Sequence, residues 1–186
     1  MVAVYDACVL YPSPLRDMLI RLAIDELIIA RWSDAILDEV FRNLRKNGHD
    51  LDPAWLDVTR RRMNEAVLDA VVSPNPATLA RIGPLPDPED AHVVATAVDA
   101  GASVIVTFNP RDFPAEVLEP LGLSALHPDA FVTELLDADP ESVVAVARAQ
   151  AADLRNPPRT VEDVLDALTR CGLVASSGRL RRDAQR

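Results

Sequence analysis

One continuous stretch decides the fold of this chain: Asp87-Pro-Glu-Asp-Ala-His-Val-Val-Ala-Thr-Ala-Val-Asp-Ala-Gly-Ala-Ser-Val-Ile-Val-Thr107. Its Asp87-Pro88 pair is the cap-then-proline signature of a helix start, and Gly101 is a typical residue just past a helix end. The β-branched run that follows, up to Thr107, predicts a buried strand. A helix followed directly by a buried strand is typical of a parallel sheet, so we predict an α/β fold.

One acidic position lies where a strand of this sheet should end. Val2 to Tyr5 is a short apolar run that predicts a first strand, and Asp6 follows it. The loop after Thr107 ends the second strand at the same edge, and a weaker strand is expected near residues 121–126. Ligands of open α/β sheets bind outside the carboxyl ends of the strands, so Asp6 is a candidate site residue. An Asp at this position also commonly caps a helix.

Helices are predicted between the strands. Apolar spacing indicates one helix from Leu15 to Leu27, and Ser33 is a suitable N-cap for a second. Asp38 and Glu39 both fall on the margins of the apolar stripe of this second helix, so periodicity does not choose between them. A third helix is expected from Asp52 through roughly Val72.

The positions of the motifs divide the chain into two predicted parts. Residues 1–126 carry the acidic positions, and residues 127–186 are predicted to be a helical extension, in which Thr160 and Asp163 form a capping-box pattern. The Arg-rich tail from about Ser176 is expected to be flexible.

Composition limits the function classes. The formal net charge of −10 argues against a protein that coats nucleic acid non-specifically, so contact with RNA must be local. Positive charge gathers between Arg42 and Arg62 and again from Arg179 to Arg182, where a solvated helix face is an equal alternative. No long apolar run predicts a membrane span. The opening residues lack the pattern of a signal peptide, so we expect a cytoplasmic protein.

The cysteines and histidines form no recognisable metal motif. Cys8 and Cys171 are far apart, and we expect each to be a small buried hydrophobic residue. The histidines have no ligand spacing such as i, i+4, and packed or surface roles are expected for His49, His92 and His127.

Four blocks in this order resemble PIN-domain proteins. They are Val-Tyr-Asp6-Ala-Cys, Trp-Ser-Asp-Ala-Ile-Leu-Asp-Glu39, Pro-Asp-Pro-Glu-Asp90-Ala-His, and Val-Ile-Val-Thr107-Phe-Asn109-Pro-Arg-Asp112-Phe. The blocks cover residues 2 to about 114. Within that family the chain is similar to the VapC toxins of bacterial VapBC toxin–antitoxin pairs, in a longer form.

The resemblance implies a three-layer α/β/α sandwich with a central parallel sheet and a Mg²⁺- or Mn²⁺-dependent endoribonuclease. The metal ligands that it implies are Asp6, Glu39 and Asp90. Asn109 joins them as a catalytic residue, with Thr107 orienting water or the phosphate beside it. Further accessory positions are Asp87 and Asp112, and candidates for positioning RNA are Arg42, Arg45 and Lys46. The implied partners are an RNA substrate and a VapB-like antitoxin, and the implied assembly is a homodimer.

Two residues depart from the family pattern. Asn109 stands where an acid is frequent, and Cys8 stands where a small polar residue or Asn is common, which leaves the number of metal ions open. Asn109 also sustains the alternative of a non-catalytic PIN-like module that binds RNA or protein.

The chemistry suits the acids independently of the resemblance. Hard divalent cations take oxygen ligands, and a bound ion activates water and stabilises charge in phosphodiester hydrolysis. Without the ion, the clustered acids should repel one another and raise the pKa of at least one carboxyl group. An aspartyl phosphatase would need a second aspartate where Cys8 stands, and a phospho-receiver domain would need a lysine at a later strand end, whereas Lys46 is in a helix.

Overall fold

The structure is a computed structural model that describes residues 1–47 and 52–184. Its centre is a four-stranded, all-parallel sheet with the strand order β2-β1-β3-β4. The strands are β1 (Val2–Tyr5), β2 (Ile29–Arg31), β3 (Val104–Val106) and β4 (Ser124–Leu126). Parallel neighbours need crossover connections, and helices supply them here. The predicted PIN-like α/β/α class with a central parallel sheet and C-terminal helices is confirmed.

Two compact units make up the chain. The first contains Met1–Tyr11 and Ile28–His127, and therefore the whole sheet. The second contains Pro12–Leu27 and the residues from Pro128 onward. The division predicted at residue 126 differs from these units in one segment, because Pro12–Leu27 groups with the C-terminal helices.

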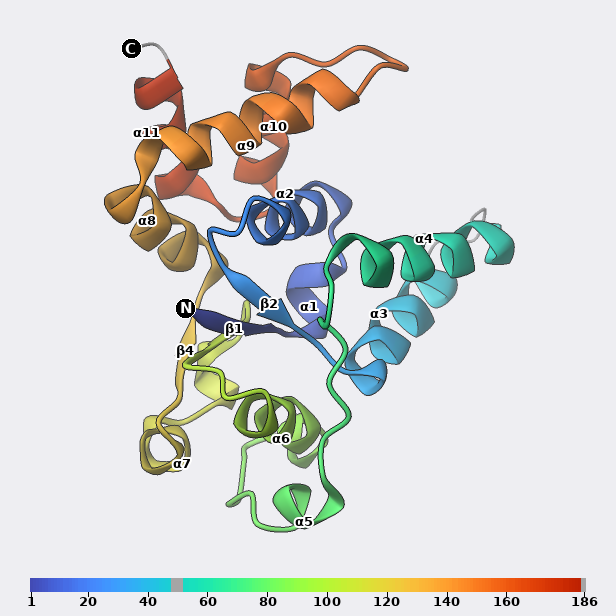
Figure 1. Ribbon diagram of the computed structural model, residues 1–186, viewed down its shortest axis with the longest axis vertical. Coiled ribbons are helices and arrows are strands. Elements are labelled where there is room, and N and C mark those ends of the chain that lie inside the picture. Colours follow the sequence, from blue (N-terminus) through green and yellow to red (C-terminus); the bar gives the residue numbers. More distant parts are fainter. Residues whose placement is uncertain (48–51, 185–186) are drawn as a thin grey trace. The chain divides into compact units, whose positions relative to one another are not determined.

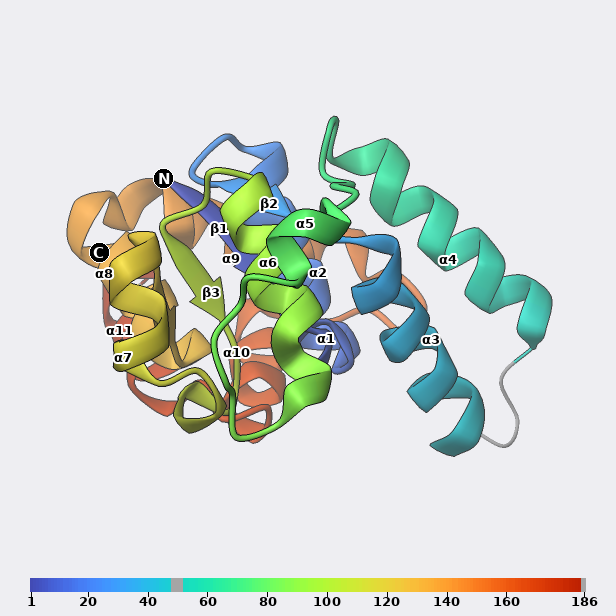
Figure 2. The same cartoon turned by 90° about the horizontal axis from the view of Figure 1, so that it is seen from below.

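The first unit also contains helices. They are α1 (Ala7–Leu10), α3 (Asp34–Asn47), α4 (Pro53–Ala66), α5 (Pro76–Leu79), α6 (Ala91–Asp99) and α7 (Ala115–Leu118). Single 3-10 turns occur at Pro88–Asp90, Pro110–Asp112 and Glu119–Leu121. Helix α6 lies against β1 and β3, and α5 lies beside α6 (Figures 1 and 2). The buried face of α6 includes Val93, Val94 and Ala97 and covers the centre of the sheet.

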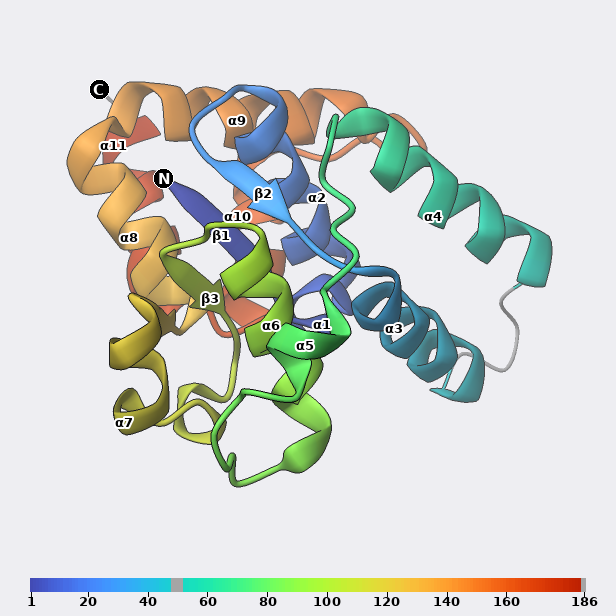
Figure 3. The ribbon, with the colours of Figure 1, turned by 60° about the horizontal axis from the view of Figure 1, so that its bottom comes forward.

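Helices α3 and α4 lie side by side, as Figure 3 shows. Asp52 caps α4 as predicted, by accepting a hydrogen bond from the Ala54 amide. The prediction that α4 continues to Val72 is wrong, because the helix ends at Ala66. Asp69 has a φ of 58°, and the backbone beyond it pairs with Trp32, whose amide donates to Ala70 O at 2.9 Å. A tertiary pairing therefore ends the helical run.

Strand β2 was not predicted. It is only three residues long, and it begins inside the short apolar run Leu27 to Ala30, which directly follows the segment predicted as a helix. A run this short does not distinguish a strand from the end of a helix. Its pairing with β1 places Ala30 opposite Ala3, and long-range hydrogen bonds define it.

The second unit is helical. It contains α2 (Ser13–Ile24), α8 (Pro128–Ala138), α9 (Pro140–Asp153), α10 (Val161–Arg170) and α11 (Val174–Ala184). The Gln150 amide in α9 donates to Pro14 O at 2.9 Å, and Arg21 in α2 forms an ion pair with Asp153. The capping box of Thr160 and Asp163 is confirmed.

The flexible tail predicted from about Ser176 is wrong up to Ala184, because this segment forms α11. Asp129 accepts hydrogen bonds from the amides of Ala175 and Ser176, which satisfies the first turn of the helix. Ser176 and Leu180 are buried, so burial orders a segment whose composition resembles a flexible tail. The last two residues of the tail lie outside the described residues. Among the described helices, none is long and apolar enough to cross a membrane.

Candidate functional site

The strand order places a topological switch point between β1 and β3. From β1 the chain first reaches β2 on one side and later β3 on the other. Asp6 directly follows β1 and Thr107 directly follows β3, and the Asp6 amide donates to Val106 O at 3.1 Å. Open α/β sheets bind ligands in the crevice at such a point. The fold thus brings together two residues that are 101 positions apart in the sequence.

The Asp6 carboxylate is held by three donors. It caps α1 by accepting from the Ala7 amide at Oδ1, at 2.6 Å. Its Oδ2 accepts from the Thr107 hydroxyl at 2.7 Å and from the Cys8 thiol at 3.0 Å. Asp6 is only 8% exposed and Thr107 is fully buried. The capping role expected as an alternative for Asp6 is therefore real, and it coexists with a fixed carboxylate at the sheet edge.

Four acids act electrostatically on Asp90. Its pKa is raised to about 7, first because burial disfavours the charged form and then because of the charges of Asp6, Asp87, Asp112 and Glu39. The charge contributions to this shift act between carboxylates that lie near one another and repel. The structure therefore gathers these acids from four separate segments of the first unit into one acidic cluster, which we define as Asp6, Glu39, Asp90 and Asp112, with Asp87 at its margin.

Glu39 is the acid of α3 that belongs to this cluster. Its pKa is raised by burial and by the charge of Asp6, while Arg42 acts in the opposite direction. Asp38 instead forms an ion pair with Arg60 of α4. The structure thus separates two neighbours that helical periodicity did not.

Asp87 and Asp90 have different local roles. Asp87 caps the 3-10 turn by accepting from the Glu89 amide at 2.9 Å, as predicted for an N-cap. The Asp90 side chain makes no capping hydrogen bond within the part of the chain that the structure describes. A carboxyl group that is half-buried, crowded by like charges and not used for capping is typical of functional sites.

The loop after β3 contributes through its backbone. The Asn109 amide donates to Thr107 Oγ1 at 3.1 Å, and the Asn109 side chain is exposed. Asp112, in the following 3-10 turn, is the member of this loop whose charge raises the pKa of Asp90. The Thr107 hydroxyl, expected to orient water or phosphate, is buried and donates to Asp6 instead.

Sequence reasoning missed two residues of this site. Cys8 was expected to be a buried hydrophobic residue, yet its thiol donates to Asp6, and burial together with the Asp6 charge raises its pKa. His92 was given a packed or surface role, yet its Nε2 lies 4.0 Å from Glu39 Oε2. Burial lowers the pKa of His92. The sequence signal for Cys8 is its position two residues after a strand-end aspartate, where the family pattern commonly has a small polar residue or Asn. His92 has no such signal, because its partner comes from another helix.

His127 packs edge-on against Phe108, with ring centroids 5.3 Å apart. His49 lies outside the described residues.

The candidates for positioning RNA differ in their surroundings. Arg42 is close enough to the acidic cluster to lower the pKa of Glu39. Arg45 forms an exposed ion pair with Asp57 at 3.0 Å, and Lys46 is exposed in the last turn of α3. In the second unit Arg179 and Arg181 form ion pairs with acids of neighbouring helices, so that basic group is largely neutralised.

No group of three His, Cys, Asp or Glu side chains converges closely enough to hold a metal ion among residues 1–47 and 52–184. The donor set of the acidic cluster nevertheless fits a hard divalent cation, because it consists of carboxylate oxygens. The raised pKa values of Asp90 and Glu39 show that the charges of these acids are not balanced by the residues around them.

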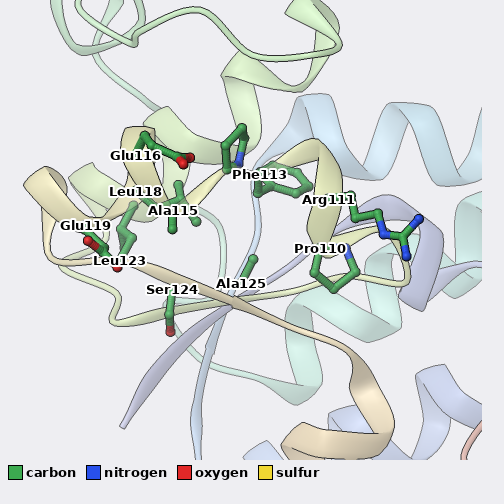
Figure 4. Close-up of a pocket in the computed structure, with 11 residues that line it drawn as sticks. Pro110, Arg111, Phe113, Ala115, Glu116, Leu118, Glu119, Leu123, Ser124 and Ala125 are labelled. Carbon is green, nitrogen blue, oxygen red and sulfur yellow. The ribbon is translucent and has the colours of Figure 1, made fainter.

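A separate pocket of about 460 Å³ lies between the loop after β3 and strand β4 (Figure 4). Its lining includes Phe113, Leu118, Leu123 and Ala125, with Arg111 at one end. Glu116 and Glu119 also line this pocket, but none of its lining residues belongs to the acidic cluster.

Comparison with known proteins decides the family. A family model described as "PIN domain" matches residues 2–111, which is more than half of the chain. The chain belongs to the PIN-domain family. A second model, described as "VapC50 C-terminal domain", matches residues 128–182, which form the C-terminal helices.

A curated relative supports the VapC type. The chain is 42% identical over 80 residues to "Putative ribonuclease VapC50" from Mycobacterium tuberculosis (strain ATCC 25618 / H37Rv). The match covers 43% of this chain and 47% of the relative, so it spans about half of that protein. The comparison with solved structures gave no match. The predicted resemblance to VapC-type PIN proteins with a helical C-terminal extension is thereby confirmed.

Proposed function

We propose that this PIN-domain protein is a divalent-metal-dependent endoribonuclease and the toxin of a type II toxin–antitoxin pair. The observation that carries the proposal is the acidic cluster at the switch point of the sheet, where the pKa of Asp90 is raised to about 7 by burial and by surrounding carboxylates. Family membership and the name of the curated relative support the same proposal.

Asp6, Glu39 and Asp90 would hold Mg²⁺ or Mn²⁺. Their oxygens are the ligands that these cations prefer, and a cation would relieve the repulsion that now raises the pKa values of Glu39 and Asp90. When bound, such an ion supplies Lewis acidity and lowers the pKa of a coordinated water.

Other residues near the acidic cluster have supporting roles in this proposal. Thr107, buried beneath Asp6, fixes the orientation of its carboxylate. Asp112 is close enough to act on Asp90 and is the fourth acid of the site, whereas Asn109 supplies a backbone amide and an exposed side chain. Arg42 lies beside Glu39 and is best placed to contact an RNA phosphate, with Arg45 and Lys46 further along α3.

The partners follow from the proposed toxin role. A VapB-like antitoxin would cover the acidic cluster, and pairing of two toxin chains is the expected assembly. The division of labour, with chemistry in residues 1–126 and an accessory role for residues 127–186, stays a prediction, as does the cytoplasmic location.

A cleavage assay on total cellular RNA tests the proposal. The purified chain should cut RNA in Mg²⁺, EDTA should stop the reaction, and Asp6→Asn should be inactive at every Mg²⁺ concentration. Cleavage that persists in EDTA would exclude the metal-dependent reaction. RNA binding without cleavage in Mg²⁺ or Mn²⁺ would favour the alternative, a non-catalytic PIN-like binding module.

A further inference from the structure

Cys8 contacts the acidic cluster through a hydrogen-bond network that spans two strand ends. It lies in α1, two residues after Asp6, and its Sγ is 3.0 Å from Asp6 Oδ2. The same sulfur is 3.4 Å from the hydroxyl oxygen of Thr107 and accepts from the Phe108 amide at 3.2 Å. The thiol therefore touches the carboxylate, the buried hydroxyl and the loop after β3.

Two chains of hydrogen bonds end on the same oxygen, Oδ2 of Asp6. In one of them the Phe108 amide donates to Cys8, whose thiol donates to Asp6 Oδ2. In the other the Asn109 amide donates to Thr107, whose hydroxyl donates to the same Oδ2. Two successive backbone amides of the loop after β3 thus fix the two side chains that hold Asp6.

The network determines which part of the carboxylate remains available. A carboxylate offers about four acceptor positions, about two on each oxygen. Cys8 and Thr107 occupy those of Oδ2, and the Ala7 amide occupies one on Oδ1. The position that remains is on Oδ1, so the two side-chain donors leave a single acceptor position for a further ligand.

We propose that Cys8 is a positioning residue of the metal centre, whose thiol, with Thr107, orients the Asp6 carboxylate so that it binds a divalent cation through Oδ1. The inference rests on the proposed function, since it assigns Cys8 a role at the same site. Groups that orient metal ligands by hydrogen bonds typically contribute 10- to 100-fold to metal affinity or activity, which sets the size of the expected effect at roughly tenfold or more.

Substitutions at Cys8 separate positioning from space filling. Cys8→Ser keeps a donor and an acceptor on a shorter side chain. Cys8→Val keeps an apolar side chain of similar bulk without a donor, and Cys8→Ala removes both donor and bulk. If Cys8 only fills space, Cys8→Val should bind Mn²⁺ like the parent and Cys8→Ser should bind more weakly. If Cys8 positions Asp6, Cys8→Ser should bind like the parent and Cys8→Val should bind more weakly.

The test is calorimetric titration of Mn²⁺ into the full chain, well below the melting temperature that each variant shows in chelator. We expect Cys8→Ala and Cys8→Val to bind Mn²⁺ roughly tenfold or more weakly than the parent, and Cys8→Ser to stay within about threefold of it. Parent-like affinity of Cys8→Ala and Cys8→Val, or a loss in Cys8→Ser as large as in Cys8→Ala, would overturn the inference. Thr107→Ser, which retains the second donor, should bind like the parent.

Asp6→Asn distinguishes this inference from the proposed function. Loss of binding in Asp6→Asn together with parent-like binding in Cys8→Ala and Cys8→Val rejects the role of Cys8 and leaves the metal centre intact. Equal binding by the parent and Asp6→Asn rejects the metal centre and the positioning role with it.

Discussion

The Thr107 hydroxyl donates a hydrogen bond of 2.7 Å to Oδ2 of Asp6, joining the carboxyl ends of β3 and β1. Thr107 is fully buried and Asp6 nearly so, so this bond is shielded from water. A hydrogen bond to a charged group in such a setting contributes more than an exposed one. It ties the loop after β3 to the first acid of the site.

Removing the Thr107 hydroxyl should therefore weaken both stability and the site. Thr107→Val leaves Asp6 with one side-chain donor fewer and the Asn109 amide without its acceptor. We expect a loss of about 1–3 kcal/mol in the free energy of unfolding, measured by urea denaturation. Thr107→Ser keeps the hydroxyl and should lose much less. A loss in Thr107→Ser that exceeds the loss in Thr107→Val would assign the effect to the methyl group instead.

Metal-free stability should fall as the pH rises through the range set by Asp90. Its folded-state pKa of about 7 lies above the ordinary value of 3.8, so the folded state binds a proton that the unfolded state releases. The stabilising contribution is complete below about pH 4 and is lost as the pH rises through about 7. Melting temperatures in chelator should show this fall, superimposed on other titrations, and Asp90→Asn should reduce it. An unchanged pH profile in Asp90→Asn would contradict the assignment.

Arg42 and Arg45 should differ in their effect on RNA binding. Arg42 acts on Glu39 of the cluster, whereas Arg45 is engaged by Asp57. With Ca²⁺ in place of Mg²⁺, Arg42→Ala should lower the salt dependence of RNA binding by about 0.7 in the log–log slope, the value for one phosphate contact on a single strand. Arg45→Ala serves as the matched control with a smaller change. A larger change in the slope for Arg45→Ala than for Arg42→Ala would place the RNA along the C-terminal end of α3.

The helical unit should support stability without taking part in metal binding. Asp129 holds the first turn of α11 through the amides of Ala175 and Ser176, so Asp129→Ala should cost about 1–2 kcal/mol. Its Mn²⁺ affinity, measured while folded, should equal that of the parent. A large loss of affinity would show that residues 127–186 do contribute to the site. A fragment ending at residue 126 is a poorer test, because it would remove the partners of Pro14 and Arg21 in α2.

Local signals in the sequence predicted the parts of the fold that local interactions determine. The caps at Asp52, Asp87 and Thr160 and the buried strand β3 follow from nearby residues, and the structure confirms them. Strand β2 and the early end of α4 depend instead on pairing with β1 and Trp32, which neighbouring residues do not encode. Burial against other helices likewise orders α11.

The candidate site also combines features that local sequence signals predict with features that depend on long-range contacts. The positions of Asp6, Glu39 and Asp90 within their motifs identified them as candidates, and the structure brings their charges together. Cys8 was marked only as a departure from the family pattern, and its contact with Thr107 exists only at the folded sheet edge. His92 could not be found, because Glu39 lies on another helix. Long-range contacts decided which neighbour, Asp38 or Glu39, belongs to the cluster.

The measurement that tests the account most directly is single-turnover RNA cleavage in Mg²⁺ by two neighbouring variants. Asp87 caps the 3-10 turn, whereas Asp90 is crowded by the acids of the cluster. Asp90→Asn should reduce cleavage to the level seen in EDTA, while its melting temperature in chelator equals or exceeds that of the parent. Asp87→Asn should keep substantial cleavage, because an amide oxygen can still cap the turn. Undiminished cleavage by Asp90→Asn would contradict the catalytic assignment, and lost cleavage with a clearly lowered metal-free melting temperature would show that Asp90 serves the helix instead.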